Sequence, residues 1–160
     1  DAHVLADVRL GTAFGIFHGC LGQAFLVLTA VIALLTGRWW RNLAALEIPA
    51  STQNWFLGTT LLIFLQLLIA ATMRHQHAGL AISDFPLAYG QWWPDMSAEA
   101  VAGYNLRRVE VTIDNPITTF QIGLQMTHRV VALLIVVAVG ICFAKSRAGT
   151  PLRRLAAGGW

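Results

Sequence analysis

Two adjacent ionisable residues, His128 and Arg129, lie inside a long apolar stretch of the sequence. From Phe120 to Ala144 most residues are apolar, and at about 1.5 Å per residue the stretch can cross a hydrocarbon core roughly 30 Å thick. An ionisable side chain within a membrane span is costly, and it usually faces a partner, a cavity or a bound group. The pair His128-Arg129 is therefore the first candidate for a functional site.

A second histidine, His18, lies in another apolar stretch, from Ala13 to Leu35. His18 lies about 8 Å and His128 about 12 Å from the same end of their stretches, by the helical rise. Imidazole is a common iron ligand in haem proteins. The similar depths favour a haem-binding role, and the alternative for each residue is a packed, hydrogen-bonded core histidine.

Two arginines suit the carboxylates of a porphyrin. Arg74 ends the second apolar stretch and Arg129 follows His128, so both are expected near the same membrane surface as the histidines. Charge-assisted pairs between guanidinium and carboxylate groups are short and strong. For Arg74 the sequence leaves a second possibility open, which is snorkelling to lipid headgroups.

The composition indicates a membrane protein. Hydrophobic residues make up 56% of the chain and charged residues 12%, whereas soluble domains carry about 25% charged residues. The formal net charge of +3 is small and no basic cluster alternates with aromatic residues, so no nucleic-acid partner is predicted. Cys20 and Cys142 fall in apolar stretches and are predicted to be small buried hydrophobic residues, not a disulfide or a metal site.

The predicted fold class is all-α, a polytopic transmembrane helix bundle that forms a single membrane domain over residues 1–160. The hydropathy pattern predicts three full spans and a truncated fourth, at about 9–36, 55–75, 116–146 and from about 152. Asn115 and Pro116 suit the N-cap and first position of the third span. Because the fourth span breaks off, the chain is expected to be a fragment.

The loop at 79–114 is too polar to span a membrane. Ser97 is predicted to cap a short helix from Ala98 to about Arg108. Trp92 and Trp93 are typical interface aromatics, and the loop is expected to form an ordered lid on the membrane surface.

A glycine stripe marks the first span. Gly11, Gly15 and Gly19 recur every four residues and share one face of a helix. Such a stripe allows another backbone to approach closely, or leaves room for a flat ligand.

The basic residues predict the orientation. If three spans alternate, most lysines and arginines outside the spans share one side, namely Arg38, Arg41, Lys145, Arg147, Arg153 and Arg154. The positive-inside rule places this side in the cytoplasm and the loop at 79–114 outside it. The predicted location is therefore the cell (inner) membrane, with several passes.

Several short motifs resemble those of the haem A synthase family. They are Leu65-Gln66, Ala71-Thr72-Met73-Arg74-His75, Ala78-Gly79-Leu80-Ala81, Asp84-Phe85-Pro86, Gly90, and Gln125-Met126-Thr127-His128-Arg129-Val130. The stretch His18-Gly19-Cys20-Leu21-Gly22-Gln23 is similar to the second histidine of one half of that family. In this family two similar four-helix halves form eight spans, and each half has a pair of histidines for one haem.

The resemblance covers most of the chain and implies a register from the fourth to the sixth span, with the start of the seventh. It implies that His18 and His128 are iron ligands in different halves, with Arg74 and Arg129 also binding cofactor. The implied cofactor is haem b, and the implied substrate is haem O, whose methyl group the family oxidises to make haem A. It assigns no catalytic residue in this chain.

The chain departs from the family at two places. Ile82 and Ala88 stand where the family often carries a cysteine pair, so no thiol redox step is expected in the loop. Gln125 stands where the other half of the family often has an acidic residue. Because a glutamine cannot act as a general base, this half is expected to hold a cofactor, with Gln125 bonding a ligand or a water.

The predicted function is that of a haem A synthase-like membrane oxidoreductase for cytochrome oxidase assembly, although the fragment alone is expected to be inactive. The alternatives are a b-type cytochrome that carries electrons and a structural assembly subunit. The expected partners are membrane lipid, haem O and the enzyme that produces haem O, and a homo-oligomer is compatible with this interpretation.

Overall fold

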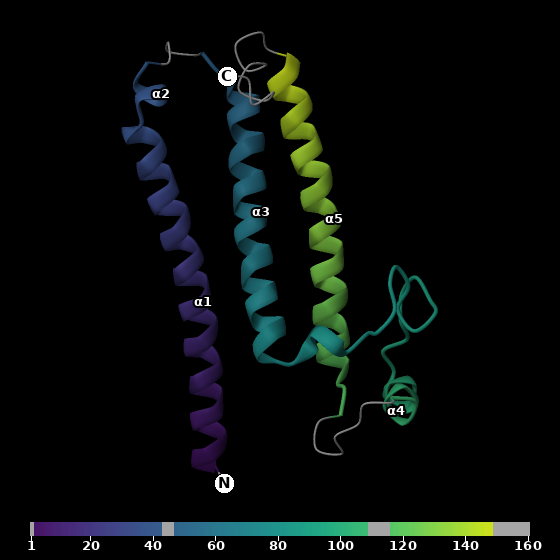
Figure 1. The fold of residues 1–160 in the computed structure, drawn as a ribbon. Coiled ribbons are helices and arrows are strands. Elements are labelled where there is room, and N and C mark those ends of the chain that lie inside the picture. The colour runs from purple at the N-terminus through teal and green to yellow at the C-terminus, as the bar shows by residue number, and fades with distance from the viewer. Residues whose placement is uncertain (1, 43–46, 109–115, 149–160) are drawn as a thin grey trace. The chain divides into compact units, whose positions relative to one another are not determined.

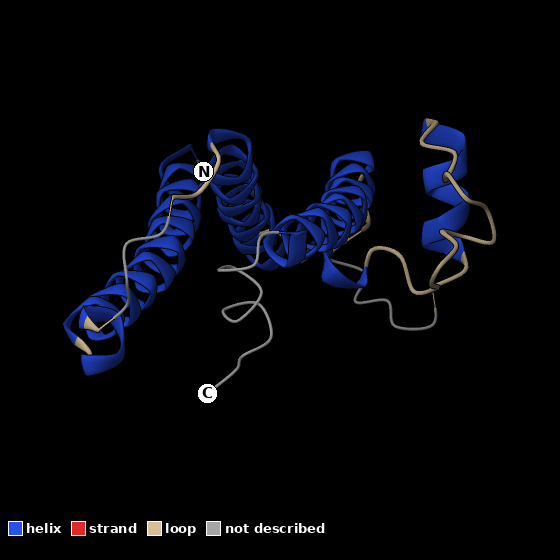
Figure 2. Ribbon diagram, turned by 90° about the horizontal axis from the view of Figure 1, so that it is seen from above, coloured by secondary structure: helices blue, strands red, loops and turns tan. Residues whose placement is uncertain are grey.

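The computed structural model describes residues 2–42, 47–108 and 116–148, and within these ranges the regular structure is helical, without a strand. The long helices are α1 (Ala2–Thr36), α3 (Ala50–His75) and α5 (Thr119–Ala148), and the short ones are α2 (Arg38–Arg41), η1 (Ala78–Leu80) and α4 (Ala98–Leu106), as Figures 1 and 2 show. Three described segments are long and apolar enough to cross a membrane, namely Leu10–Thr36, Ala50–His75 and Thr119–Arg147. The all-α, polytopic fold class is therefore confirmed, while the predicted span from 152 lies outside the described residues.

The chain forms two compact units, and the long helices contribute to both. The first unit contains Asp1–Ile16 and Leu68–Val130, and the second contains Phe17–Leu67 and Val131–Trp160.

In the second unit, α3 and α5 meet through a polar contact. The Thr59 hydroxyl lies 3.3 Å from the Cys142 sulfur, and both side chains are buried. Cys142 is thus the buried small residue that the sequence predicts. Cys20 is only partly buried, so the prediction is wrong for this residue, because the part of α1 around it is covered on few sides.

Two helices begin at places that differ from the predicted span ends. The helix α3 starts at Ala50, directly after Pro49, so the polar residues up to Asn54 are helical and not part of a connection. The helix α5 starts at Thr119, and Pro116 precedes it in a non-helical conformation. The predicted N-cap Asn115 lies outside the described residues.

The start of α5 is fixed by a reciprocal pair of hydrogen bonds. The Thr118 N–H donates to Gln121 Oε1 at 2.9 Å, and the Gln121 N–H donates to the Thr118 hydroxyl oxygen at 3.3 Å. This is a capping box, in which two side chains satisfy two backbone donors at a helix start. The sequence Thr118-Thr119-Phe120-Gln121 has the pattern of a capping box. The predicted helix start was instead based on Pro116.

The loop between α3 and α5 folds around a hydrophobic core that it shares with the first turns of α5. The buried members are Ala81, Ile82, Ala88, Val101, Tyr104, Ile117, Ile122 and Met126. Ser97 caps α4 by accepting a hydrogen bond from the Ala100 N–H, as predicted. Ile82 and Ala88 are both in this core, so apolar packing orders the loop here.

Candidate functional site

One face of α5 holds the loop through three polar side chains. Gln121, Gln125 and Arg129 are spaced four residues apart, which places them on one side of a helix. All three make hydrogen bonds with backbone groups in the segment at 76–87. We call these three residues the α5 clamp.

Gln125 makes the central contacts of the α5 clamp. The Ile82 N–H donates to Gln125 Oε1 at 2.7 Å, and Gln125 Nε2 donates to the carbonyl oxygens of Ile82 and Gly79 at 3.2 Å each. Because its amide already bonds these backbone groups, Gln125 is a loop anchor here.

Arg129 binds the next part of the loop. Its Nη1 donates to the Leu87 carbonyl at 2.8 Å and its Nη2 to the Asp84 carbonyl at 2.7 Å. The guanidinium carbon also lies 5.5 Å from the centre of the Phe85 ring. Since a guanidinium has five N–H donors, these two bonds fix its plane and leave donors that suit a carboxylate.

Gln121 joins α5 to the residue that follows α3. Its Nε2 donates to the Gln76 carbonyl at 2.7 Å, while its Oε1 takes part in the capping box. Gln76 directly follows α3, which ends at His75. The α5 clamp therefore connects the end of α3 with the start of α5.

Asp84 closes a tight turn beside Arg129. Its carboxylate accepts hydrogen bonds of 2.8 Å from the N–H groups of Tyr89 and Gly90, and both residues have a positive φ. Burial alone raises the pKa of Asp84, but the bonds from Gly90 and Tyr89, together with the charge of Arg129, bring that pKa below its usual value of 3.8. The turn is thus stabilised by an ionised carboxylate.

His128 precedes Arg129 on α5, and one residue turns a helix by about 100°. His128 therefore lies on a face next to that of the α5 clamp. The side chain is partly buried, and its Nδ1 atom is shielded from solvent. An imidazole beside a guanidinium of fixed orientation is a donor set that fits a haem with an anionic carboxylate.

The other two predicted site residues lie elsewhere. His18 is exposed on α1 in the second unit, and Arg74 is exposed in the last turn of α3 in the first unit. Within the described residues there is no group of three or more His, Cys, Asp or Glu side chains that could hold a metal ion. The structure brings Arg129 into contact with the loop, through the carbonyl groups of Leu87 and Asp84.

One close contact occurs at the glycine stripe, and it is made by a side chain and not by another backbone. A Cβ atom built on Gly15 would lie 2.2 Å from Cε1 of His75, so the His75 imidazole lies directly on Gly15. Around Gly11, Gly19 and Gly22 no such atom is found within 4 Å among the described residues. The sequence analysis did not select His75, although it follows Arg74 in the quoted motif.

Comparison with known proteins gives a family. The family model COX15-CtaA, described as cytochrome oxidase assembly protein, matches residues 14–159. No curated protein and no solved structure gave a significant match. The family match covers most of α1, all of α3 and α5, and both candidate histidines, and the chain therefore belongs to the COX15-CtaA family of cytochrome oxidase assembly proteins.

Proposed function

We propose that this chain is part of a haem A synthase, in which His128 ligates the iron of a resident haem b. The observation that carries the proposal is the position of His128 beside Arg129, whose guanidinium is oriented by two loop carbonyls, in a chain of this family. When bound, the haem supplies one-electron redox chemistry. His128 has to be neutral to ligate iron, and an apolar surrounding favours that form.

Arg129 is proposed to hold a haem propionate with the N–H groups that do not bond the loop. Arg74, exposed at the end of α3, is proposed to serve the same class of carboxylate. A hydrogen bond to a charged group contributes about 1.5–3 kcal/mol. The loop is proposed to lie outside the cytoplasm, on the side given by the positive-inside rule.

His18 is proposed to serve the other half, where the methyl group of haem O is oxidised to give haem A. Such an oxidation removes protons and electrons and adds an oxygen atom, and proton removal requires an ionisable group. Gln125 cannot take a proton, and its amide is already bonded to the loop backbone. This engagement supports a cofactor role for the half that contains His128.

The test is the pigment content of the full-length protein. We expect His128→Ala to lose the resident haem b, and His18→Ala to abolish haem A formation while haem b is retained. His77→Asn is the matched control, since His77 is exposed and its left-handed backbone suits asparagine. Retention of haem b in His128→Ala, with its loss in His18→Ala, would reverse the assignment.

The hydrogen bonds of Gln125 to the loop backbone also favour a second function. This is a b-type cytochrome that carries electrons and has no synthase activity. The two functions differ in whether the protein forms haem A. If the full-length protein binds haem b but forms no haem A when supplied with haem O and an oxidant, the electron carrier is the correct function. A protein without any haem would leave only the structural assembly subunit.

A further inference from the structure

Phe85 lies against the side chain that is proposed to hold a haem propionate. The guanidinium carbon of Arg129 is over the Phe85 ring, 5.5 Å from its centre, and both residues belong to the first unit. A guanidinium within about 6 Å of a ring centre is attracted by the π electrons of that ring. The Phe85 side chain is nevertheless 82% exposed. It therefore contacts Arg129 and still has surface for a further group.

The position of this ring follows from the backbone on both sides of it. The carbonyl groups of Asp84 and Leu87 accept hydrogen bonds of 2.7 and 2.8 Å from Arg129. Phe85 comes between these two residues in the sequence, so the segment that carries the ring passes along the guanidinium. The carbonyls bond two N–H groups, whereas the ring adds an attraction that needs no hydrogen-bond acceptor. The remaining N–H groups stay available for a carboxylate.

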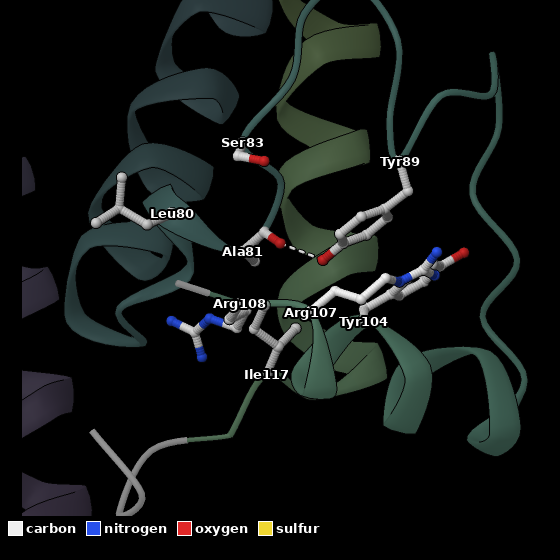
Figure 3. Close-up of a pocket in the computed structure, with 8 residues that line it drawn as sticks. All are labelled: Leu80, Ala81, Ser83, Tyr89, Tyr104, Arg107, Arg108 and Ile117. Carbon is white, nitrogen blue, oxygen red and sulfur yellow. Dashed lines mark hydrogen bonds between the residues drawn. The ribbon is translucent and has the colours of Figure 1, made fainter. Parts of the chain in front are cut away.

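Further contacts fix the shape of the turn that carries Phe85. The Asp84 carboxylate accepts a hydrogen bond of 2.8 Å from the Tyr89 N–H. The Tyr89 ring stacks on the Tyr104 ring with centroids 3.6 Å apart, and its hydroxyl donates to the Ala81 carbonyl, as Figure 3 shows. A ring on such a turn is already in place beside Arg129 when a ligand binds, which lowers the entropic cost of binding.

An apolar ring beside a charge reduces the access of water to that charge. Hydrogen bonds and ion pairs are stronger where the effective dielectric constant is low. A carboxylate that binds Arg129 next to Phe85 is therefore held more tightly than it would be beside a polar side chain. The polarity near a haem also helps to set its reduction potential. A poorly screened guanidinium disfavours the oxidised iron, which carries one more positive charge, and so raises that potential.

We propose that Phe85 is a positioning residue for the haem propionate and acts through Arg129. The ring shields the guanidinium from water and helps to hold it in the orientation that the two loop carbonyls set. The inference rests on the proposed function, because it requires a haem whose propionate binds Arg129. It adds to that function a residue that has no hydrogen-bonding or ionisable side chain.

The experiment measures haem retention in the full-length protein for Phe85→Ala and Phe85→Trp. Alanine removes the ring, whereas tryptophan keeps an aromatic face and is the strongest cation–π partner among the aromatic residues. We expect Phe85→Ala to lose haem b to apomyoglobin about fivefold faster than the wild type, and to have a lower haem midpoint potential. Phe85→Trp should keep both properties of the wild type. Trp92→Ala is the control and should do the same, since Trp92 is similarly exposed in the same loop.

A haem analogue tests whether the effect passes through the propionate. The dimethyl ester of haem b has the same macrocycle but no carboxylate, so its rate of loss should be equal in Phe85→Ala and the wild type. A double-mutant cycle tests the dependence on Arg129. In the background of Arg129→Gln, the further change Phe85→Ala should not increase the rate of haem loss.

Chymotrypsin cleavage after Trp92, measured on the same preparations, reports on the loop itself. It should be equal in Phe85→Ala and the wild type, because the carbonyl groups that bond Arg129 belong to the main chain. Faster haem loss together with faster cleavage would mean that Phe85 only shapes the loop, and would overturn the proposal. Wild-type haem loss and potential in Phe85→Ala, or equally faster loss of the ester, would overturn it while the proposed function stands. A full-length wild type that binds no haem would overturn both.

Discussion

Gln125 and Ile82 are joined by two hydrogen bonds, because the side-chain amide of Gln125 accepts from the Ile82 N–H and donates to the Ile82 carbonyl. The same arrangement recurs between Asn105 and Ile117, at 2.7 and 2.9 Å. In both cases an amide side chain satisfies both backbone groups of an isoleucine in the loop core. Buried peptide groups that cannot join a helix are thereby paired.

Replacing Gln125 with leucine should release the loop. Both partners are buried, with 8% of Gln125 and 4% of Ile82 exposed, so the variant leaves buried backbone groups without partners. Each such group costs about 1–3 kcal/mol. We expect faster cleavage of the loop by chymotrypsin after the exposed Trp92 in the full-length protein.

Gln23→Leu is the matched control for that variant, since Gln23 is exposed on α1. It should leave loop cleavage unchanged. Equal cleavage rates for Gln125→Leu and the wild type would mean that the α5 clamp does not hold the loop.

Substitutions of Arg129 should separate its two proposed roles. Arg129→Lys keeps a cation for a carboxylate but cannot reproduce a planar fork that reaches two carbonyls. We expect Arg129→Lys to retain haem and to increase loop cleavage, and Arg129→Gln to impair both. Haem content and chymotrypsin cleavage, measured on the same preparation, check this. If Arg129→Lys leaves the loop protected, the bonds to Asp84 and Leu87 contribute little.

The turn at Asp84 should depend on pH. Its folded-state pKa is lower than the ordinary value of 3.8, so the stability it contributes is present above that value and is lost as the pH falls below it, through the folded-state pKa. A fluorophore on Ser83→Cys, an exposed position beside the turn, should report a transition in that acid range. The transition should be absent in Asp84→Asn and unchanged in Glu99→Gln, and a transition that persists in Asp84→Asn belongs to another group.

Gly15→Ala should be more harmful than Gly11→Ala. The new methyl group would meet the His75 imidazole, and overpacking costs about 1–3 kcal/mol. At Gly11 no described atom lies within 4 Å, so alanine should stabilise the helix by about 0.5–1 kcal/mol. Thermal unfolding of the full-length protein measures both. Adding His75→Ala should relieve Gly15→Ala, and if it does not, the contact is not the cause.

The proposed orientation can be tested with a matched pair of cysteines. Ser51 lies at the start of α3 and Ser83 lies beyond its end, and both are exposed. In a background in which Cys20 and Cys142 are replaced, a membrane-impermeant thiol reagent applied from outside should label Ser83→Cys but not Ser51→Cys. The opposite pattern would reverse the orientation.

The hydropathy of the sequence was sufficient to predict the helical membrane fold, because a span needs only length and apolar composition. The cap of α4 by Ser97 was also predictable, since a cap is a local interaction. The loop anchors were not predictable. Gln121 and Gln125 bond residues more than 40 positions away, and no local signal reveals which backbone groups a glutamine will meet.

Placement of the candidate site was predictable only in part. The position of His128 within α5 followed from the sequence, and so did the position of Arg129 beside it. The bonds of Arg129 to the carbonyls of Asp84 and Leu87 depend on the fold of the loop. The predicted start of α5 was a few residues too early, because a proline and a capping box are both typical of a helix start. In the structure, the hydrogen bonds between Thr118 and Gln121 define where the helix begins.

The hydrogen bonds that the α5 clamp makes with the described residues between α3 and α5 go to main-chain atoms, namely those of Gln76, Gly79, Ile82, Asp84 and Leu87. Main-chain atoms are the same in every residue type, so the hydrogen bonds of the clamp recognise the path of the loop and not its amino acids. Exposed loop side chains such as Ser83 and Phe85 are therefore free to vary without loss of these bonds. A loop of different sequence that follows the same path could be transplanted onto this helix.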